Sequence, residues 1–428
     1  MAHSWPLVPL GELVDPTRGI SYGIVQPGEH VADGIPIVRA GDLRGDRIDA
    51  ESPLRVASNI ESKYSRTRLR GGELVMSIVG TVGQTGIVDE RFIGWNTARA
   101  VAVIPVRSDI GAYWVRIALK TPAARERINN RLNTTVQATL NLRDVAELPI
   151  ALPPLVERQA IASVLGALDD KIELNRRMNV TLEAIARAIF KDWFVDFGPI
   201  RAKIAGRAPY LAADIWALFP EALDDGGKPA GWVSGTLGDV AQQVGEAVKP
   251  ESLDPDTSYI GLEHMPRRSI ALSNWDGAGK VTSGKLAFSK GDILFGKLRP
   301  YFHKVGIAPV DGICSTDIVV LNAREKYAAP FVLVCISQDE FVAFTDRTSD
   351  GTKMPRTSWG RMERFGLCLP SAQALNGYKD FVGPMLDRIV SNIHESRTLG
   401  VTRDLLLPRL LSGEIRVKEA DRLVGDVP

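Results

Sequence analysis

A long helical segment that opens with a proline returns once more near the C-terminus of this chain. The first copy, "LPPLVERQAIASVLGALDDKIELNRRMN", begins at Leu152, and the second, "LPSAQALNGYKDFVGPMLDRIVSNIHES", begins at Leu369. The offset (369 − 152 = 217) is kept by Ile172 and Ile389. A repeat this long in a chain of 428 residues predicts two copies of one architectural unit.

The segments before the two helices also match in order. "WPLVPLGELV" at 5–14 corresponds to "WVSGTLGDVA" at 232–241, and "NTARAVAVI" at 96–104 corresponds to "STDIVVLNA" at 315–323. Short apolar runs bounded by Gly, Pro, Asp and Asn are typical of strands. They alternate with helical stretches, one in each copy, so an α+β fold is expected. Chance similarity of two unrelated mixed domains is the alternative, but it does not explain the shared order. The two stretches are Ala112–Arg131 and Pro330–Thr345.

These matches divide the chain into six parts. The segment between the copies has Pro/Gly punctuation and one possible short helix, Leu211–Phe219, so we expect a linker that packs on something through its aromatic residues. The expected parts are a first globular domain at 1–153, a long helix at 154–195, the linker at 196–231, a second globular domain at 232–370, a second long helix at 371–412 and a C-terminal tail at 413–428.

Both long helices carry an apolar seam with heptad spacing. The seam runs through ten positions from Ile161 to Trp193, and the same positions shifted by 217 residues are again mostly apolar. Such a seam is typical of coiled coils, and polar residues within it fix the register at a cost in stability. We therefore expect an antiparallel, coiled-coil-like pair of helices. The alternative is that each helix packs on its own domain with its seam amides in water. The polar interruptions are Asn175, Asn179, Asn392 and Ser396.

One feature departs from the symmetry of the two helices. Gly383 and Pro384 lie in the early turns of the second helix. Proline inside a helix removes a backbone hydrogen bond and costs about 3 kcal/mol. The sequence therefore predicts that the second helix begins late or bends near Pro384.

Composition limits the classes of function. Hydrophobic residues make up 45% of the chain and charged residues 24%. The net charge is only +1, so any affinity for nucleic acid must come from local cations or from a partner.

The sequence also indicates where the protein resides. The three cysteines form no CxxC pair, and the N-terminus lacks the pattern of a signal peptide. No apolar run reaches the roughly 18–20 residues of a membrane helix. We expect a cytoplasmic protein without a membrane partner.

Motifs for catalysis are incomplete in this sequence. "GKVTSGKL" follows the phosphate-loop spacing but fails at Leu286, where a hydroxyl should bind Mg²⁺. Asp292 and Lys297 could imitate part of a nuclease site, yet Asp292 aligns with Glu73 as an acid at the entry to a strand. The five histidines are scattered without metal-ligand spacing. We expect no catalytic residue, no metal and no cofactor in the chain.

Three motifs carry a resemblance that covers essentially the whole chain: "LPIALPPLVERQAIASVLGALDDKIELNRRMN", "AIFKDWFVDFGPIRAK" and "RDLLLPRLLSGEI". They resemble the DNA specificity subunit of type I restriction–modification systems. The resemblance implies two target-recognition domains that read the halves of a bipartite, asymmetric site on double-stranded DNA, with the paired helices as spacer. It also implies a non-catalytic subunit that positions two DNA adenine methyltransferase subunits and the restriction/translocase subunits. S-adenosylmethionine, ATP and Mg²⁺ would bind those partners.

The repeat also points to candidate DNA-contacting loops. Lys and Arg bind phosphates, while Gln, Asn and Arg can read base edges. The alternative for each residue is an ordinary solvated side chain. For the chain, the alternatives are a stand-alone nuclease or NTPase, and a scaffold without a nucleic-acid role. The candidates are Lys63, Arg66, Arg68, Arg70, Thr81, Gln84, Thr135, Gln137 and Asn141 in copy one, and Arg267, Arg268, Lys297, Arg299, His303, Lys304, Lys353, Arg356 and Ser358 in copy two.

Overall fold

The computed structural model describes residues 5–50, 52–133 and 137–417. The chain divides into two compact units. Unit 1 comprises Met1–Asp170 and Leu399–Pro428, and unit 2 comprises Lys171–Thr398. Each is an α+β structure, as the sequence predicts, and each is described here by itself.

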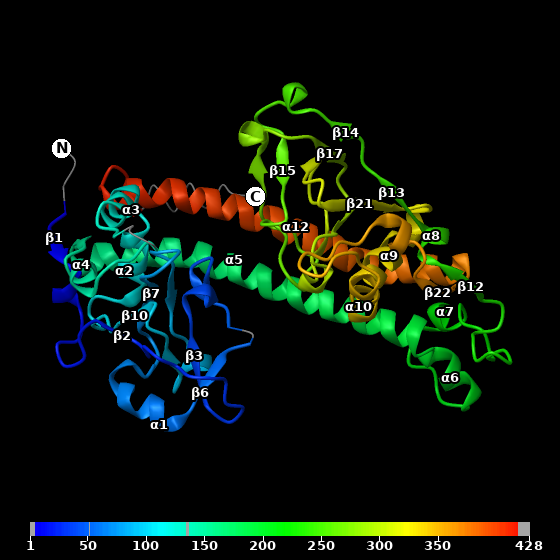
Figure 1. Ribbon diagram of the computed structural model, residues 1–428, viewed down its shortest axis with the longest axis horizontal. Coiled ribbons are helices and arrows are strands. Elements are labelled where there is room, and N and C mark those ends of the chain that lie inside the picture. The colour runs from blue at the N-terminus through cyan, green and yellow to red at the C-terminus, as the bar shows by residue number, and fades with distance from the viewer. Residues whose placement is uncertain (1–4, 51, 134–136, 418–428) are drawn as a thin grey trace. The chain divides into compact units, whose positions relative to one another are not determined.

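The centre of unit 1 is a four-stranded antiparallel sheet in the order β2-β10-β7-β8. Strands β7 and β10 are buried along their full lengths, because they are continuous apolar runs with protein on both faces. Figure 1 shows α2 beside these strands. The strands are β2 (Ser21–Tyr22), β10 (Val101–Ile104), β7 (Leu74–Ser77) and β8 (Thr85–Ile87).

Smaller sheets complete unit 1. A three-stranded sheet has the order β6-β3-β9, β4 pairs with β5, and β1 pairs with β11 so that the start of the domain is fastened to the strand that leads into the first long helix. The strands are β1 (Leu7–Pro9), β3 (Ile35–Val38), β4 (Leu43–Arg44), β5 (Arg47–Ile48), β6 (Leu54–Val56), β9 (Asn96–Thr97) and β11 (Pro149–Ala151). The short helices are α1 (Ser58–Glu61), α2 (Ala112–Leu119), α3 (Pro122–Asn129) and α4 (Leu142–Ala146).

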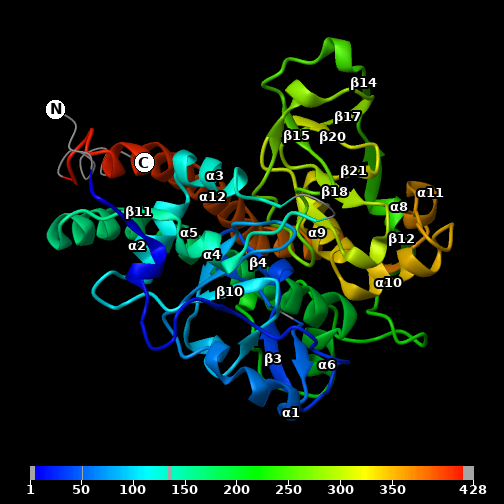
Figure 2. The same cartoon turned by 60° about the vertical axis from the view of Figure 1, so that its left-hand side comes forward.

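Unit 2 repeats the main sheet. Its order, β13-β21-β18-β19, matches that of unit 1 strand for strand, and β12 pairs with β22 as β1 pairs with β11. In both views α9 and α10 lie next to this sheet (Figures 1 and 2). The strands are β12 (Val233–Thr236), β13 (Ala241–Val244), β18 (Ile293–Gly296), β19 (Val305–Ile307), β21 (Ile318–Ala323) and β22 (Gly366–Leu369). The helices are α8 (Leu237–Val240), α9 (Ala329–Ile336), α10 (Asp339–Arg347) and α11 (Trp359–Met362).

The second sheet of unit 2 is larger than its counterpart in unit 1. It has five strands in the order β14-β17-β20-β15-β16, and Figure 2 shows β15, β17 and β20 side by side. Strands β15 and β20 are parallel, like β3 and β9 in unit 1, so the duplication extends to this sheet as well. The strands are β14 (Ala247–Val248), β15 (Ser258–Ile260), β16 (Asp276–Gly277), β17 (Lys285–Phe288) and β20 (Gly312–Cys314).

Two stretches expected to be helical are each divided into two helices in the structure. Ala112–Arg131 is divided into α2 and α3, and Pro330–Thr345 is divided into α9 and α10. In unit 1 the break has a clear cause, because Thr121 accepts a hydrogen bond from the backbone of Ala124 (3.2 Å) and Pro122 begins the next helix.

Across the described part of the chain no single helix is long and apolar enough to span a membrane. The segments of α9 and α10 reach that length and hydrophobicity only when taken together, and they form a bent pair.

The long helices are α5 (Leu155–Phe190) and α12 (Ala372–Leu411). α5 continues as a wider π turn over Lys191–Val195. The expected late start of the second helix is wrong, because α12 is continuous from Ala372 through Pro384. Pro384 and Asp380 are both exposed, so the carbonyl that proline leaves without a helical donor can bond water.

Within unit 2 the two long helices pair in opposite directions, as expected. Their contacts join Asn175 to Ser396, Asn179 to Asn392 and Tyr378 to the backbone of Ala186. As residue numbers rise along α5, those of the partner residues fall along α12, which defines the antiparallel arrangement.

The segment expected to be a linker has structure of its own. It contains α6 (Gly198–Ile204) and α7 (Ala213–Trp216), so the expected helix Leu211–Phe219 is shorter than predicted and α6 was missed. α6 was missed because Gly198 and Pro199 are residue types that usually interrupt a helix. Pro is nevertheless favoured at the start of a helix, which is its position here. The aromatic residues do pack: Trp193, Phe194 and Phe219 enter the core of unit 2.

Candidate nucleic-acid interface

Two candidate segments of unit 2 meet at one end of the main sheet. The loop between β18 and β19 is joined to the loop 350–358 by backbone hydrogen bonds from Arg299 to Pro355 (2.7 Å) and from Thr357 to Lys297 (3.0 Å). Isolated bridges pair Arg356 with both Leu298 and Asp350. Segments more than 50 residues apart therefore form one surface.

The equivalent segments of unit 1 meet in the same way. Backbone hydrogen bonds run from Gly80 to Ala138 (2.9 Å) and from Leu140 to Ile78 (2.9 Å). The isolated bridges are also equivalent, because Thr139 pairs with both Val79 and Asn133. The described parts of this surface include Thr81, Gln84, Gln137 and Asn141, whereas Thr135 lies outside the described residues.

Both surfaces end on a short helix that begins with a polar residue. Asn141 precedes α4 and Ser358 precedes α11, and the two positions differ by the repeat offset (358 − 141 = 217). Asn and Ser at this position usually accept a hydrogen bond from their own helix. Neither side chain does so within the described structure, and both are exposed, so both are available to another partner.

A third segment enlarges the surface of unit 2. The backbone N–H of Arg268 donates to the carbonyl of His303 (2.9 Å), which places the "MPRR" segment beside the β18–β19 loop. Of the candidate cations gathered here, four are exposed and three are half-buried. The exposed ones are Arg267, Arg268, Lys353 and Arg356, and the half-buried ones are Lys297, Arg299 and Lys304.

Several of these cations already have acidic or carbonyl partners. Arg268 pairs with Asp339 (2.9 Å) and Arg356 pairs with Asp317 (3.3 Å). Exposed ion pairs of this kind contribute about 0–1 kcal/mol, so they can be exchanged for phosphate contacts. The ammonium of Lys304 donates to the carbonyl of Leu262 (2.5 Å), and burial together with the nearby Arg267 lowers its pKa.

His303 is not at the surface, which corrects the expectation from the sequence. Its side chain is buried, and Nε2 lies 3.0 Å from the carbonyl of Ser337. Burial lowers the pKa of His303. The backbone of His303 has a left-handed φ of 52°, and its neighbours Phe302 and Lys304 are both half-buried. His303 therefore shapes the loop and is removed from the set of possible DNA contacts.

The basic loop of unit 1 is anchored by buried carboxylates. Glu61 is buried and accepts hydrogen bonds from Arg68 (2.9 Å) and from Asn96 (3.0 Å). The hydrogen bond from Arg68 is the main cause that lowers the pKa of Glu61. Arg68 is thus committed to holding the loop. Lys63, Arg66 and Arg70 are exposed, as is Arg68 itself.

A second anchor of this loop was missed in the sequence. Arg18 bonds Glu73 (2.6 Å) and also donates to the carbonyl of Arg68 (3.1 Å), while Arg66 donates back to the carbonyl of Arg18 (2.8 Å). Arg18 is about 50 residues away along the chain, and no local pattern marks it.

Asp292 and Glu73 occupy equivalent turns and share a role. Glu73 accepts a hydrogen bond from the backbone of Arg70 (2.8 Å), and Asp292 accepts one from Ser289 (2.8 Å), in each case three residues earlier. Their backbone role favours the strand-entry interpretation over a nuclease site. In the part of the chain that the structure describes, no group of three or more His, Cys, Asp or Glu residues is placed to hold a metal ion.

The polar residues of the helix seam contact one another in unit 2. Nδ2 of Asn392 donates to Oδ1 of Asn179 (2.8 Å). Nδ2 of Asn175 lies 2.8 Å from Glu395 and 3.4 Å from Ser396. Asn175 and Asn392 are fully buried, so these amides do not face water. Glu395 was missed because it stands beside the heptad seam; it also pairs with Lys171 (3.1 Å).

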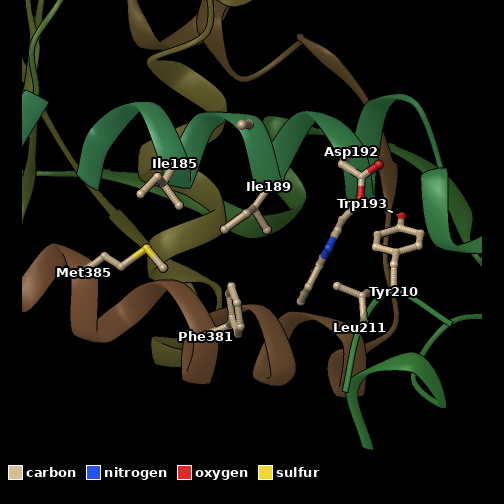
Figure 3. Close-up of a pocket in the computed structure, with 9 residues that line it drawn as sticks. Ile185, Ile189, Asp192, Trp193, Tyr210, Leu211, Phe381 and Met385 are labelled. Atoms are coloured by element: carbon tan, nitrogen blue, oxygen red, sulfur yellow. Dashed lines mark hydrogen bonds between the residues drawn. The ribbon is translucent and has the colours of Figure 1, made fainter. Parts of the chain in front are cut away.

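An apolar groove of about 390 Å³ lies where α5 and α12 meet the segment around Tyr210. Figure 3 shows Ile185 and Ile189 of α5 facing Phe381 and Met385 of α12, with Trp193 and Tyr210 at one end. The hydroxyl of Tyr210 donates to Asp192 (2.8 Å), which fixes that end of the groove. Ile185 and Phe381 are each about two-fifths exposed, which is unusual for large apolar side chains on paired helices.

With this geometry, the molecule is a duplicated α+β protein whose copies present matching pairs of polar and basic loops. Residues 27–184 match the family model described as "Type I restriction modification DNA specificity domain". The chain therefore carries that domain, and the resemblance expected from the sequence is confirmed.

Curated relatives agree with this assignment. The chain is 31% identical over 238 residues to the type I restriction enzyme EcoBI specificity subunit of Escherichia coli, a match that covers 53% of this chain and 50% of that protein. It is 26% identical over 338 residues to the HindI specificity subunit of Haemophilus influenzae, covering 67% and 72%. The chain thus spans about half the length of the first of these relatives.

A solved structure shares the fold. The crystal structure of the type I restriction–modification system S subunit from M. genitalium aligns over 95% of this chain and 96% of its own, with a TM-score of 0.50 and 15% sequence identity. At that identity the likeness concerns the fold alone.

Proposed function

We propose that this chain is the non-catalytic DNA-recognition subunit of a type I restriction–modification complex. Its two α+β copies would each read one half of a bipartite, asymmetric site on double-stranded DNA. The observation that carries the proposal is the duplicated surface, in which the β7–β8 and β18–β19 loops are joined to the segments before α4 and α11 by equivalent backbone bridges. The match of residues 27–184 to a DNA specificity domain supports it.

The paired helices would act as the spacer between the two readers. α12 has 40 residues and α5 has 36, so each is about 50–60 Å long at 1.5 Å per residue. One turn of B-DNA spans about 34–36 Å, so helices of this length suit half-sites separated along the duplex. The buried amide contacts between Asn179 and Asn392 support a fixed register.

The chemistry would belong to partner subunits. We propose two DNA adenine methyltransferase subunits, which would bind S-adenosylmethionine, and restriction/translocase subunits, which would bind ATP and Mg²⁺. The complex would work in the cytoplasm. The incomplete phosphate-loop motif at "GKVTSGKL" and the structural role of Asp292 argue against a nuclease or NTPase in this chain.

The apolar groove supports a protein partner on the helices. Its lining is apolar apart from Asp192 and the Tyr210 hydroxyl, so it suits an apolar side chain better than a phosphate. Phe381→Asp should abolish co-purification with the methyltransferase subunit. Lys379→Asp, at an exposed position on the same helix outside the groove lining, should not. Unchanged co-purification of Phe381→Asp would exclude the groove as the docking site.

The basic surface of unit 2 provides a test of DNA binding. Lys353→Ala with Arg356→Ala should weaken binding of the methyltransferase complex to DNA about tenfold at moderate salt, and should reduce the slope of log K against log salt by about 2. The matched control is Lys290→Ala with Lys326→Ala, because these exposed lysines lie beyond the opposite ends of β18 and β21. Equal losses in both double variants, measured by fluorescence anisotropy, would contradict the proposed surface.

A further inference from the structure

Tyr301 is an exposed aromatic residue at the tip of the β18–β19 loop. Its side chain is about half exposed, although its neighbours in the loop are half-buried or buried. The loop is short and well held: the backbone of Phe302 donates to Arg299 (2.9 Å) and that of His303 donates to Pro300 (2.8 Å). The exposed position of the ring therefore follows from a defined conformation of the loop.

That conformation is costly for the residues that adopt it. Arg299 and His303, on either side of the turn Pro300–Phe302, have left-handed φ values of 51° and 52°. A non-glycine residue is strained in this region, because its Cβ comes too close to the backbone carbonyl oxygen. Buried contacts of the loop hold it in place, because Arg299 donates to Pro355 and His303 lies against Ser337. The fold thus maintains strain on both sides of an aromatic tip.

Two guanidinium groups lie against Phe302, the aromatic residue next to the tip. The guanidinium of Arg267 lies 4.0 Å from the centre of the Phe302 ring, and that of Arg299 lies 5.9 Å from it. The Tyr301 and Phe302 rings meet edge to face, with centres 4.8 Å apart. Phe302 is thereby covered on its face by Arg267, whereas Tyr301 projects from the cluster. A ring that projects from a set of guanidinium groups complements a polyanion that also carries flat bases.

We propose that Tyr301 is a stacking wedge, which presses its ring against one base step of double-stranded DNA while the surrounding cations hold the phosphates. This inference rests on the proposed function and adds a specificity-determining residue to it. Proteins that insert an apolar or aromatic wedge partly unstack a base step, and the cost depends on the sequence of that step. Tyr301 would select a deformable step in one half of the site.

The wedge belongs to one copy only. The matching turn of unit 1 reads Gly80-Thr81-Val82-Gly83, with left-handed glycines at both ends and no aromatic residue. Left-handed residues therefore flank both turns, but unit 2 uses Arg and His where unit 1 uses Gly. The distortion should accordingly be confined to the half-site that unit 2 reads.

The test uses the full chain with its methyltransferase subunit. The DNA is a duplex that carries the sequence motif that this complex methylates. Tyr301→Ala should bind about fivefold to a hundredfold more weakly than the wild type, whereas Tyr301→Phe, which keeps the ring, should bind normally. Replacing single nucleotides of the motif by abasic sites should reveal one position at which lost stacking strengthens binding by the wild type and by Tyr301→Phe, but not by Tyr301→Ala.

Different results would contradict the Tyr301 wedge and the proposed DNA-recognition function. Equal affinity and the same abasic profile for wild type and Tyr301→Ala would overturn the wedge and leave DNA recognition intact. If the wild-type complex does not prefer the motif over a scrambled duplex, the recognition function itself fails. Because Tyr301 is half exposed, its truncation should leave the folded structure unchanged, and circular dichroism of each variant checks this.

Discussion

At the scale of single residues, the hydrogen bond between Asn179 and Asn392 is a polar contact inside an apolar seam. Asn392→Leu would leave buried polar atoms of Asn179 without this partner, and should lower the free energy of unfolding by about 1–3 kcal/mol. Asn179→Leu with Asn392→Leu removes both partners and should cost less than the sum of the single changes. Urea unfolding of the double-mutant cycle measures this difference.

The control for this cycle is the exposed Asn376 of the same helix. Asn376→Leu should change the free energy of unfolding by no more than about 0.5 kcal/mol. Strict additivity of the two seam substitutions would show that the amides do not act as a pair.

Asp169 is the second residue with a strong electrostatic role, in unit 1. It accepts hydrogen bonds from Tyr113 (3.0 Å), Arg116 (2.6 Å) and Arg403 (2.7 Å). Burial alone would raise the pKa of Asp169, but Arg403, Arg116 and Lys120 outweigh burial and hold it below its ordinary value of 3.8.

Asp169→Asn should therefore destabilise unit 1 by about 3–5 kcal/mol at neutral pH, because two partly buried arginines lose their counter-ion. A lowered pKa in the folded state contributes stability above the ordinary pKa, and this stability is lost as pH falls through the folded value. The difference in the free energy of unfolding between wild type and Asp169→Asn should have its full size at pH 7 and pH 5. It should shrink only below about pH 4. Denaturant titrations at these pH values measure it, with the exposed neighbour Asp170→Asn as control. If this difference in unfolding free energy already disappears at pH 5, the lowered pKa of Asp169 is contradicted.

What could be predicted at this scale depended on periodicity. Asn175 and Asn392 could be singled out because they interrupt a regular apolar seam. Glu395 and Arg18 could not, because their partners are set by three-dimensional packing of segments that no local pattern connects. His303 was expected at the surface because the sequence shows neither its left-handed backbone nor its buried contact with Ser337.

At the scale of elements, the pairing of α5 with α12 within unit 2 depends on register. Inserting seven residues between Asn175 and Asn179 lengthens α5 alone by about 10 Å, so the seam contacts with Ser396 and Asn392 cannot both form. We expect loss of the complex with the methyltransferase subunit, or loss of DNA binding, measured by co-purification and anisotropy.

The matched control inserts seven residues into both helices, in α5 at that point and in α12 between Asn392 and Ser396, which restores the pairing. Recovery of assembly in the double insertion shows that register, rather than the insertion itself, is decisive. Unchanged methylation of the original site by the single insertion would contradict the role of the helices as a spacer.

Long elements were easier to predict than short ones. The heptad pattern predicted both long helices because it is sustained over ten seam positions, from Ile161 to Trp193 and again 217 residues later. Pro384 was overrated, because an exposed backbone carbonyl can bond water where proline removes its donor. The breaks between α2 and α3 and between α9 and α10 were not predicted, although Pro122 is a residue type favoured in the first turn of a new helix.

At the scale of the whole molecule, the duplication predicts modular recognition. Replacing residues 1–150 by the corresponding part of another specificity subunit should change one half of the methylated motif and leave the other half intact, because each copy has its own sheet and its own loops. The reciprocal replacement of residues 232–370 should change the other half. Changes in both halves from a single replacement would contradict independent readers.

The sequence predicts the duplication itself, because the order of the segments and their offset are preserved. It does not predict the recognised bases, because these depend on a few side chains in the loops.

The most direct test of DNA recognition is base-resolved detection of modified adenines. The chain would be expressed with its neighbouring methyltransferase subunit in a host that lacks both, beside a control strain with the methyltransferase subunit alone. We predict adenine methylation in one bipartite motif with a fixed gap, present only when this chain is expressed. Absence of any such motif, or the same motif without this chain, would contradict its role as the DNA-recognition subunit.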